Sequence, residues 1–375
     1  MTTLLYVLFW LSLFLVIYNY LLYPWLVFVL SRFRELKHDC YTRDEDLPSV
    51  CLIIPALGDL ATIRTKIRNT LRLSYPEKKL ILLTISDKND TDVQALLTEY
   101  KKHHIINFCK RGIDNTYHAL DLGAKLAKTS IIIFSDVRNE LNDMAVRNLA
   151  RHFKDPSVGA VSGVRSLYTS KSSQASAGDN LYWKYETFIK NAESRLGSIT
   201  GAAGELLAIR KSLYQTIDKD YINFDSAITF KLIAQGYRVI MDDEALSLMD
   251  SSRDMKYSFH ERVTMARGGF QTLFREWRQL FSFKSWFTFS YHSHKTLRLF
   301  IPFLLIALFL IPFWLLEDPV MTVIMTLQLM FYVLALVGWF LRNNSDMPAF
   351  IKLASWYASM NAAVLVGLVR FIIRI

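Results

Sequence analysis

Acidic side chains stand where several apolar segments of this chain end. Residues 131–139 read three isoleucines, a phenylalanine and a serine before Asp136, and such a run is typical of a strand that is covered on both faces. Asp59 follows the first apolar run in the middle of the chain, and Asp87 ends the second. Because ligands bind at the carboxyl edge of open α/β sheets, we expect these carboxylates to meet in one crevice. A single Asp at such a place can instead start a turn or cap a helix, and this alternative stays open for Asp136.

The elements that must hold these residues alternate between strand and helix. Apolar runs predict strands at residues 50–54, 80–85, 105–108, from 131 onward and 158–164, and amphipathic patterns predict helices at residues 63–73, 93–100, 115–128 and 144–153. This alternation favours an α/β fold with a parallel, right-handed sheet. No Gly-x-Gly-x-x-Gly turn follows the first strand, and the chain has no Gly-Lys-Ser/Thr phosphate loop, so neither a dinucleotide site nor a P-loop is expected.

The two ends of the chain are hydrophobic, whereas the middle has a mixed composition. The chain has 375 residues, 52% of them hydrophobic, and a formal net charge of +10, which is too apolar for an ordinary soluble enzyme. Residues 1–31 contain no charged side chain, and three more apolar stretches occupy residues 299–316, 320–341 and 349–372. Each is about long enough to cross the ~30 Å hydrocarbon layer of a bilayer. We therefore predict an integral protein of the inner (plasma) membrane.

Basic residues beside the spans predict the orientation. Arg32 and Arg34 directly follow the first span, and Arg342 lies between the last two. Because cytoplasmic loops carry an excess of Lys and Arg, we expect these residues and the whole middle domain to be cytoplasmic. Arg370 and Arg374 at the far end oppose this assignment.

The predicted domain boundaries follow from these segments. They are a transmembrane anchor at residues 1–31, a cytoplasmic domain at 45–272, an amphipathic interfacial segment at 273–298 and three C-terminal transmembrane helices at 299–375. The interfacial segment mixes aromatic residues with Arg275, Arg278 and Lys284, which suits a helix that lies on membrane lipid. We expect the positive net charge to attract anionic lipid headgroups and phosphorylated substrates. No nucleic-acid partner is expected, because no helix-turn-helix, zinc finger or RNA-binding motif accompanies the charge.

Two helical patterns have a packing interpretation. Residues 181–192 carry large apolar side chains at helical spacing, with Glu186 and Glu193 off this stripe, and we expect the stripe to pack into a core. In the last span, small residues recur at every fourth position from Ser359 to Gly367. This spacing favours close packing between helices.

The three cysteines do not form a recognisable site. Cys40, Cys51 and Cys109 are odd in number and show no metal-ligand spacing. They indicate a reducing compartment.

Short motifs follow one another in a characteristic order through the middle of the chain. They are Pro55-Ala56, Ser86-Asp87, Phe134-Ser135-Asp136, Val158 to Gly163, Gly201 to Gly204, and Phe224-Asp225. This series resembles the membrane-bound glycosyltransferases of family 2, of the non-processive type. The resemblance covers residues 49–274 and implies a GT-A-like α/β fold with a mostly parallel sheet and helices on both faces, plus transmembrane helices at both ends.

The resemblance also implies a role for each acid. Asp59 and Asp87 would lie at the nucleotide of a nucleotide-sugar donor, and Asp136 would be the first acid of the Asp-x-Asp metal motif. A Mg²⁺ or Mn²⁺ ion held by Asp136 would neutralise the departing diphosphate. Asp225 would be the catalytic base that takes the proton of the acceptor hydroxyl while attack on C1 inverts the anomeric centre. A helix N-cap is the alternative for Asp225.

The chain departs from the family pattern at several places, two of which bear most directly on function. The metal motif reads Asp136-Val137-Arg138, so a cation replaces its second acid. Arg138 could bind the diphosphate, since a guanidinium matches phosphate in a bidentate manner, or it could pair with Glu140 or a neighbouring acid. The Gln-x-x-Arg-Trp signature of processive synthases is absent from residues 261–265, which disfavours synthesis of a long polymer.

Two arginines flank the place where that signature would fall. Arg262 and Arg267 are candidates to reach the diphosphate, and ordinary solvent exposure is the alternative for both.

The sequence therefore predicts an inverting, hexosyl-type glycosyltransferase. It would move a sugar from a nucleotide-sugar donor to a lipid-linked or cell-envelope glycan acceptor at the cytoplasmic membrane face. The alternative is a catalytically degenerate family member that acts as a membrane-bound binding or scaffold subunit, because motif acids are missing. A transporter is disfavoured, since the predicted spans contain no intramembrane acid and no pair of broken helices.

Overall fold

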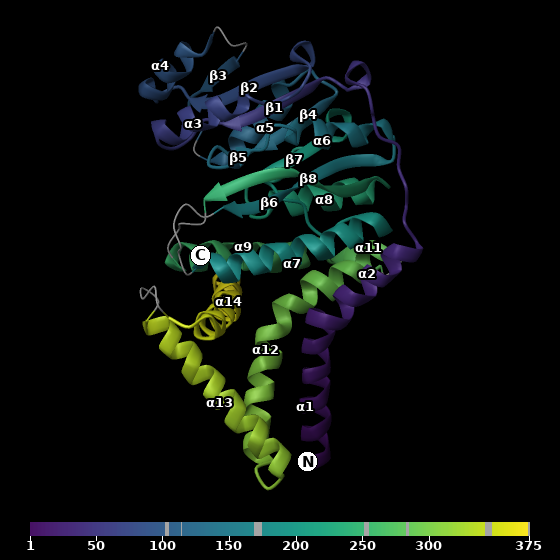
Figure 1. Ribbon diagram of the computed structural model, residues 1–375, viewed down its shortest axis with the longest axis vertical. Helices are drawn as coiled ribbons and strands as arrows, with labels where there is room; N and C mark the ends of the chain where they lie inside the picture. Colours follow the sequence, from purple (N-terminus) through teal and green to yellow (C-terminus); the bar gives the residue numbers. More distant parts are fainter. Residues whose placement is uncertain are drawn as a thin grey trace. The chain divides into compact units, whose positions relative to one another are not determined.

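A computed structural model describes residues 1–101, 105–113, 115–168, 175–250, 255–282, 285–341 and 347–373. The chain forms two compact units, whose elements are drawn in Figure 1. We call them the sheet unit (Arg34–Tyr168 and Lys190–Asp250) and the helical unit (Met1–Phe33, Thr169–Ile189 and Ser251–Ile375).

The sheet unit is built on one eight-stranded sheet, with the strand order β3-β2-β1-β4-β7-β6-β8-β5. The strands are β1 (Val50–Pro55), β2 (Leu80–Asp87), β3 (Ile105–Lys110), β4 (Ile131–Ser135), β5 (Glu140–Leu141), β6 (Val158–Tyr168), β7 (Leu206–Arg210) and β8 (Arg238–Asp250). Neighbours β3, β2, β1 and β4 run parallel, and so do β6 and β8. The remaining pairs, β4 with β7, β6 with β7 and β5 with β8, are antiparallel. The sheet is thus mostly parallel, as predicted.

Helices cover both faces of this sheet, as Figure 1 shows. They are α3 (Leu60–Thr70), α4 (Thr91–Glu99), α5 (Thr116–Leu126), α6 (Ala145–Arg151) and α8 (Phe224–Ala234), with short 3-10 turns at Asp44–Asp46, Glu77–Lys79, His152–Lys154 and Lys211–Leu213. Every residue of β1 and β4 is buried. Alternate residues of β1 explain why: Leu52 packs in one core with α3, α4 and α6, while Ile53 packs in the other with α5 and α8.

The predicted strands and helices between residues 50 and 164 are all present, with bounds shifted by a few residues. The sequence did not predict β5, β7 or β8. Strand β7 enters the sheet antiparallel between β4 and β6, so the parallel alternation inferred from the first half of the chain ends there.

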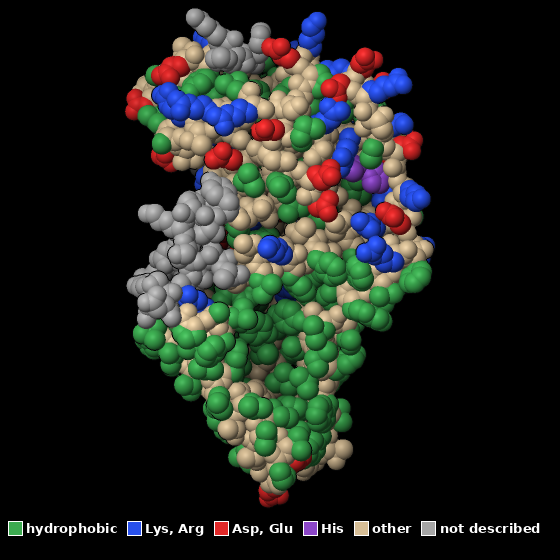
Figure 2. Space-filling view, in the orientation of Figure 1, with side chains coloured by type: hydrophobic (Ala, Val, Ile, Leu, Met, Phe, Trp, Pro, Cys, Tyr) green, Lys and Arg blue, Asp and Glu red, His purple; other side chains and the backbone are tan. Residues whose placement is uncertain are grey.

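The helical unit contains the helices long and apolar enough to cross a membrane. Its elements are α1 (Thr2–Ile17), α2 (Tyr23–Phe33), α9 (Met255–Arg275), α10 (Trp277–Leu280), α11 (Trp286–Tyr291), α12 (Leu297–Leu310), α13 (Pro319–Phe340) and α14 (Ala349–Ile372), π turns at Tyr18–Leu22 and His292–Thr296, and a 3-10 turn at Ile311–Trp314. Helix α7 (Ala175–Leu196) begins in this unit and ends in the sheet unit. The candidate spans are Thr2–Phe33, Trp286–Trp314, Pro319–Phe340 and Ala349–Ile372, and hydrophobic side chains dominate the visible surface of these helices in Figure 2. Four spans were predicted, one near the N-terminus and three near the C-terminus.

The predicted interfacial segment, residues 273–298, is not one helix. It is divided among the end of α9, the short α10, and α11 with the π turn that leads into α12. Phe274, Trp277 and Phe281 are exposed, so aromatic side chains are available for lipid, and the interfacial location stays a prediction. Lys284, and also Arg342 and Arg374, lie outside the described residues.

The two units do not follow the predicted domain boundaries residue for residue. Residues 169–189 and 251–272, which the prediction placed in the domain at 45–272, group with the helical unit. Helix α9 explains part of this grouping, because it packs along α14. The boundaries of independently folding domains stay a prediction.

Candidate active site

Three of the carboxylates singled out in the sequence lie at one edge of the sheet. Asp59 follows β1, Asp87 is the last residue of β2, and Asp136 follows β4. Because β1 pairs in parallel with both β2 and β4, all three residues are at the carboxyl edge of neighbouring strands. This is the edge at which open α/β sheets bind ligands.

Asp59 and Asp87 are held by hydrogen bonds close to the backbone. Asp59 is the N-cap of α3 and accepts from the backbone N–H (2.9 Å) and hydroxyl (2.7 Å) of Thr62. Asp87 accepts from the N–H groups of Asn89 (2.7 Å), Gly112 (3.0 Å) and Ile113 (3.1 Å), which ties the end of β2 to the loop after β3. These bonds, chiefly those from Thr62 and Asn89, lower the pKa of the two carboxyls. Both are therefore charged at neutral pH, and their contact with a nucleotide stays a prediction.

Asp136 forms a bidentate ion pair with Arg138. The Nε and Nη2 atoms of Arg138 lie 3.0 and 2.7 Å from the two carboxylate oxygens, and the Arg138 N–H donates at 2.8 Å. Burial opposes ionisation of Asp136, but the bonds from Arg138 outweigh it and lower the pKa. Of the two interpretations of Arg138, pairing with a neighbouring acid is the one that the structure contains.

A buried lysine lies behind this pair and was missed in the sequence. Lys66 of α3 is 1% exposed, and its Nζ donates to the backbone oxygen of Asn139 at 2.6 Å. Burial lowers the pKa of Lys66 to about 7, although the charges of Asp136 and Glu140 act in the opposite direction. The available signal was its position between Ile63 and Ile67, on the apolar face of a predicted helix.

Asp225 occupies a different environment from the other three acids. It is the second residue of α8, whose N-cap is Asn223, and its Oδ1 accepts from the N–H of Ser226 at 2.8 Å. The N-cap alternative for Asp225 is therefore not what the helix shows. Burial, together with the nearby charge of Glu205, raises the pKa of Asp225. A raised pKa suits a group that must accept a proton.

Glu205 connects Asp225 with the edge that carries Asp136, and it too was missed in the sequence. Its backbone oxygen accepts from the N–H of Asp136 at 3.2 Å, and its side chain accepts from Nε of Arg165 at 2.5 Å. The preceding residue, Gly204, lies so close to Asp225 that an added Cβ would stand 3.3 Å from the Cβ of Asp225. Asp136 and Asp225 are thus neighbours across one short segment, although they lie 89 positions apart in the sequence.

The two candidate arginines, Arg262 and Arg267, belong to α9 of the helical unit. Arg262 forms an ion pair with Asp179, and its guanidinium lies over the rings of Tyr182 (5.2 Å) and Trp356 (5.3 Å). Ordinary solvent exposure is thus wrong for Arg262. Its approach to a diphosphate, like that of Arg267, stays a prediction.

The part of the chain that carries these residues matches a known protein family. A family described as "Glycosyltransferase like family 2" matches residues 48–271, a range that includes all four carboxylates. The chain belongs to this glycosyltransferase family.

Curated relatives are similar to nearly two thirds of the chain. The poly-beta-1,6-N-acetyl-D-glucosamine synthase of Staphylococcus epidermidis is 24% identical over 237 residues, which are 62% of this chain and 57% of that protein. The synthase of the same name from Staphylococcus aureus (strain COL) is 24% identical over 255 residues, covering 65% of this chain and 61% of that protein. The chain thus spans about three fifths of the length of these curated relatives.

A solved glycosyltransferase has the same overall fold. The mannosyltransferase PcManGT from Pyrobaculum calidifontis, in complex with GDP-Man and Mn²⁺, superimposes with a TM-score of 0.73 at 18% identity, covering 97% of this chain and 99% of that chain. The GT-A-like fold with a mostly parallel sheet, predicted together with transmembrane helices at both ends, is confirmed.

The residues around Asp136 fit a divalent cation of the oxygen-binding kind. Mg²⁺ commonly binds through one or two carboxylates and completes its shell with substrate phosphates and water. Among the described residues, Ser135 Oγ and Asn139 Oδ1 are buried close to Asp136 in the sequence and lack a hydrogen-bond partner. The site therefore offers one carboxylate, and Arg138 must leave this carboxylate for an ion to bind it.

Proposed function

We propose that this chain is an inverting glycosyltransferase that moves a hexosyl group from a nucleotide-sugar donor to a hydroxyl of a lipid-linked or cell-envelope glycan acceptor. The observation that carries the proposal is the pair of unlike carboxyls, Asp136 at the sheet edge and Asp225 beside it across the Gly204-Glu205 segment. Asp136 has a lowered pKa and a cationic partner, whereas the pKa of Asp225 is raised by burial and by Glu205. Environments that push the pKa values of two acids apart are suited to separate roles, one as a fixed charge and one as a proton acceptor.

In the proposed reaction, Asp225 accepts the proton of the acceptor hydroxyl as the hydroxyl oxygen forms a bond to C1 of the sugar. The bond from C1 to the diphosphate oxygen breaks, and the nucleoside diphosphate leaves with the bonding electrons. Attack from the side opposite the leaving group inverts the anomeric centre. Gly204 places no side chain beside Asp225, and burial together with the charge of Glu205 raises the pKa of Asp225.

Asp136 and Arg138 are proposed to act on the diphosphate leaving group. A Mg²⁺ or Mn²⁺ ion held by Asp136 would neutralise the charge that develops on the leaving diphosphate. Arg138, whose side chain is about half exposed (48%), can exchange its contact with Asp136 for the diphosphate, since its planar fork binds phosphate as well as carboxylate. Asp59 and Asp87 are proposed to contact the nucleotide.

The four apolar helices support a location in the inner (plasma) membrane, with the sheet unit on the cytoplasmic side, where Arg32 and Arg34 follow the first span. A lipid-linked acceptor would then reach the site from the cytoplasmic surface of the membrane. Transfer of single sugars is proposed over long-polymer synthesis, because the Gln-x-x-Arg-Trp signature is absent from residues 261–265.

The proposal is tested with purified full-length protein, Mn²⁺, membrane lipid extract and a panel of nucleotide sugars. We expect one donor to bind and to release its nucleoside diphosphate, with a product of inverted anomeric configuration. A retained configuration would contradict the inverting mechanism, and a panel without binding or release would contradict the proposed activity.

One observation favours the second candidate, a membrane-bound scaffold without turnover. Arg138 stands where the motif of the family has an acid, and it occupies both oxygens of Asp136. If the chain is a scaffold, we expect it to bind a nucleotide without releasing a product. Asp225→Asn should then leave the nucleotide affinity and any partner complex unchanged.

A further inference from the structure

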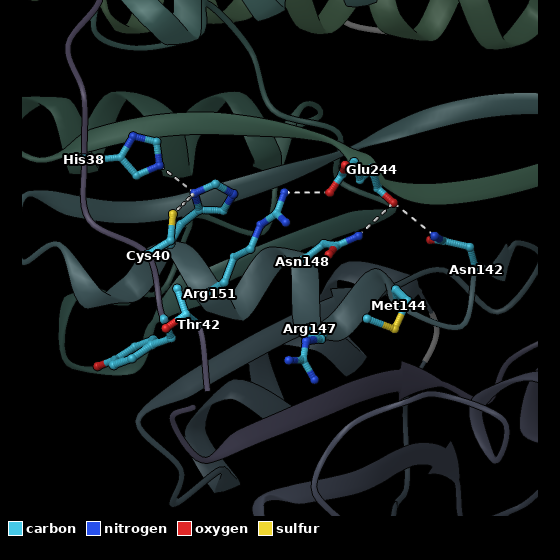
Figure 3. Close-up of a pocket in the computed structure, with 11 residues that line it drawn as sticks. His38, Cys40, Thr42, Asn142, Met144, Arg147, Asn148, Arg151 and Glu244 are labelled. Carbon is cyan, nitrogen blue, oxygen red and sulfur yellow. Dashed lines mark hydrogen bonds and ion pairs between the residues drawn. The ribbon is translucent and has the colours of Figure 1, made fainter. Parts of the chain in front are cut away.

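A second cluster of ligand-type side chains lies in the sheet unit, apart from the four carboxylates. His38 and Cys40 belong to the extended segment that follows α2, and His152 begins the 3-10 turn after α6. The Nε2 atom of His38 is 2.5 Å and the Sγ atom of Cys40 is 3.4 Å from Nδ1 of His152. Figure 3 shows both side chains directed at that one imidazole. Three ligand atoms, all within 4.8 Å of one another, therefore converge on one point.

The identity of these atoms selects the kind of ion. Two imidazole nitrogens and one sulfur are ligands that Zn²⁺ prefers, whereas Mg²⁺ and Mn²⁺ prefer oxygen. Around a tetrahedral zinc ion, bond lengths of about 2.0–2.1 Å to nitrogen and 2.3 Å to sulfur place the ligand atoms about 3.3–3.6 Å apart. The pair of Cys40 and His152 already has this separation, and His38 reaches it by a shift of roughly 1 Å along an irregular segment.

A buried carboxylate orients the imidazole of His152 for binding a metal ion. Its Nε2 lies 2.7 Å from Oδ2 of Asp242, which is 3% exposed and also bound by Arg151 at 2.8 Å. A carboxylate on one ring nitrogen fixes the proton there and leaves the lone pair of the other nitrogen facing the ligand cluster. This is the arrangement by which a histidine ligand of zinc is usually held.

The cluster opens into a cavity of about 720 Å³, whose lining includes all three side chains together with Tyr41, Thr42 and Arg147. The three protein ligands are one fewer than the four of a tetrahedral site. The cavity gives a water molecule, or another small ligand, access to the fourth position.

We propose that His38, Cys40 and His152 bind one Zn²⁺ ion, with Asp242 orienting His152 and the fourth position open to the cavity. Within the sheet unit, the ion fastens the segment that follows α2 to the 3-10 turn after α6. Two backbone hydrogen bonds already hold this segment, from Leu36 to Arg195 and from Tyr41 to Arg151, both 2.8 Å. The ion adds a third attachment between residues 112 positions apart in the sequence, so its binding stabilises the folded unit.

The test uses the full-length protein in detergent, freed of metal by a chelator, and titrates it with Zn²⁺ at neutral pH. We expect one ion per chain. Replacing a ligand, in Cys40→Ser or His38→Ala, should weaken binding by about 100-fold or more, and Asp242→Asn by about 10- to 100-fold. Cys109→Ser and Asp136→Ala are the matched controls and should bind Zn²⁺ as the unaltered protein does.

A cobalt titration of the same proteins identifies the ligands independently of affinity. Co²⁺ should give a thiolate-to-metal charge-transfer band in the unaltered protein and in Cys109→Ser, and no such band in Cys40→Ser. Equal melting temperatures of Cys40→Ser and the unaltered protein in chelator would show that the variant folds. Binding of less than one Zn²⁺ per chain, or unchanged affinity and an unchanged cobalt band in Cys40→Ser, would overturn the proposal and leave His38, His152 and Asp242 as a hydrogen-bonded chain.

Discussion

The four candidate aspartates differ in the direction of their pKa shifts. Hydrogen bonds from Thr62 and from Asn89 lower the pKa of Asp59 and Asp87, and Arg138 lowers that of Asp136 against the effect of burial. Only Asp225 among these four is shifted upward. The residue proposed as the base is thus the one whose pKa is raised, chiefly by burial.

The pH dependence of turnover tests the influence of Glu205 on Asp225. A general base must be unprotonated, so turnover rises with pH as Asp225 loses its proton, and its raised pKa places this rise above the ordinary range of an aspartate. Glu205→Gln removes a negative charge beside Asp225, which lowers the pKa and moves the acidic limb to lower pH. In Asp59→Asn, the acidic limb of the pH profile should stay at the same pH as in the unaltered protein. A limb that stays fixed or moves upward in Glu205→Gln would show that another group titrates.

Metal affinity tests the pairing of Asp136 with Arg138. With a single carboxylate, Mn²⁺ should bind poorly alone and more tightly when a nucleoside diphosphate supplies further oxygens. Arg138→Ala frees both oxygens of Asp136 and should strengthen Mn²⁺ binding in the absence of nucleotide, whereas Asp136→Ala should abolish it. Calorimetry on a Cys40→Ser background keeps the sulfur-containing cluster out of the measurement. Equal affinity with and without nucleotide, or unchanged binding in Asp136→Ala, would rule out this metal site.

The sequence located the carboxylates at strand ends but not their partners. Asp59, Asp87 and Asp136 could be found because the end of a buried strand is a local pattern. Lys66 and Glu205 were harder to find, because their partners are distant in the sequence. Lys66 donates to Asn139, which follows it by tens of residues, and Glu205 accepts from Arg165, which precedes it by tens of residues. The cluster of His38, Cys40 and His152 was also missed. Its only local signal is a His and a Cys two positions apart.

At the scale of elements, helix α7 shows where the apolar pattern misleads. The predicted buried stripe is only partly buried: Ile189 and Ala192 are, but Leu181 and Phe188 are exposed. Glu186 and Glu193, placed off the stripe, are 2% and 0% exposed. Glu193 accepts from the N–H and hydroxyl of Thr200, both at 3.0 Å.

Glu186 is buried because cations from a distant segment reach it. Its carboxylate contacts His294 at 3.1 Å, Arg298 at 2.7 Å and also Lys295. Burial opposes its ionisation, but these charges hold its pKa well below the usual range. Since the partners follow more than 100 positions later, no local pattern could predict the burial of this carboxylate.

The packing of α9 on α14 provides a stability test at this scale. A Cβ added at Gly367 would stand 2.8 Å from the Cβ of Ala266 and 2.9 and 3.0 Å from backbone atoms of Val263 and Arg267. Gly367→Ala should therefore push the helices apart and destabilise the helical unit by about 1–3 kcal/mol, less up to ~1 kcal/mol regained from the better helix propensity of alanine. Thermal unfolding in detergent measures the effect.

Gly269→Ala in α9 is the matched control. The three atoms nearest to its added Cβ belong to the side chain of Leu299, the closest at 3.2 Å, and a flexible side chain can move aside. We expect little change or a small gain in melting temperature. If Gly367→Ala melted at or above the temperature of the unaltered protein, the close contact between α9 and α14 would be refuted.

At the scale of the whole molecule, the spans were predictable and the division into units was not. Long apolar stretches are visible in the sequence itself, and four helices meet the length and composition needed to cross a membrane. The helical unit, however, recruits residues 169–189 from between two strands of the sheet unit. Hydrogen bonds from Tyr185 to the backbone of Tyr20 and from Trp356 to Asp179 hold this recruited segment. A fragment cut at the predicted domain boundaries would lose both partners, so we expect activity to require the full chain.

The central proposal is that this chain transfers a sugar with Asp225 as the base. The most direct measurement is the rate of nucleoside diphosphate release by full-length protein in lipid vesicles, for the unaltered chain and for Asp225→Asn, with donor affinity measured on the same samples. A positioned base contributes roughly 10² to 10⁴ in rate, so Asp225→Asn should lose turnover by about that factor while donor affinity and melting temperature remain. Normal turnover in Asp225→Asn would contradict the assignment of the base.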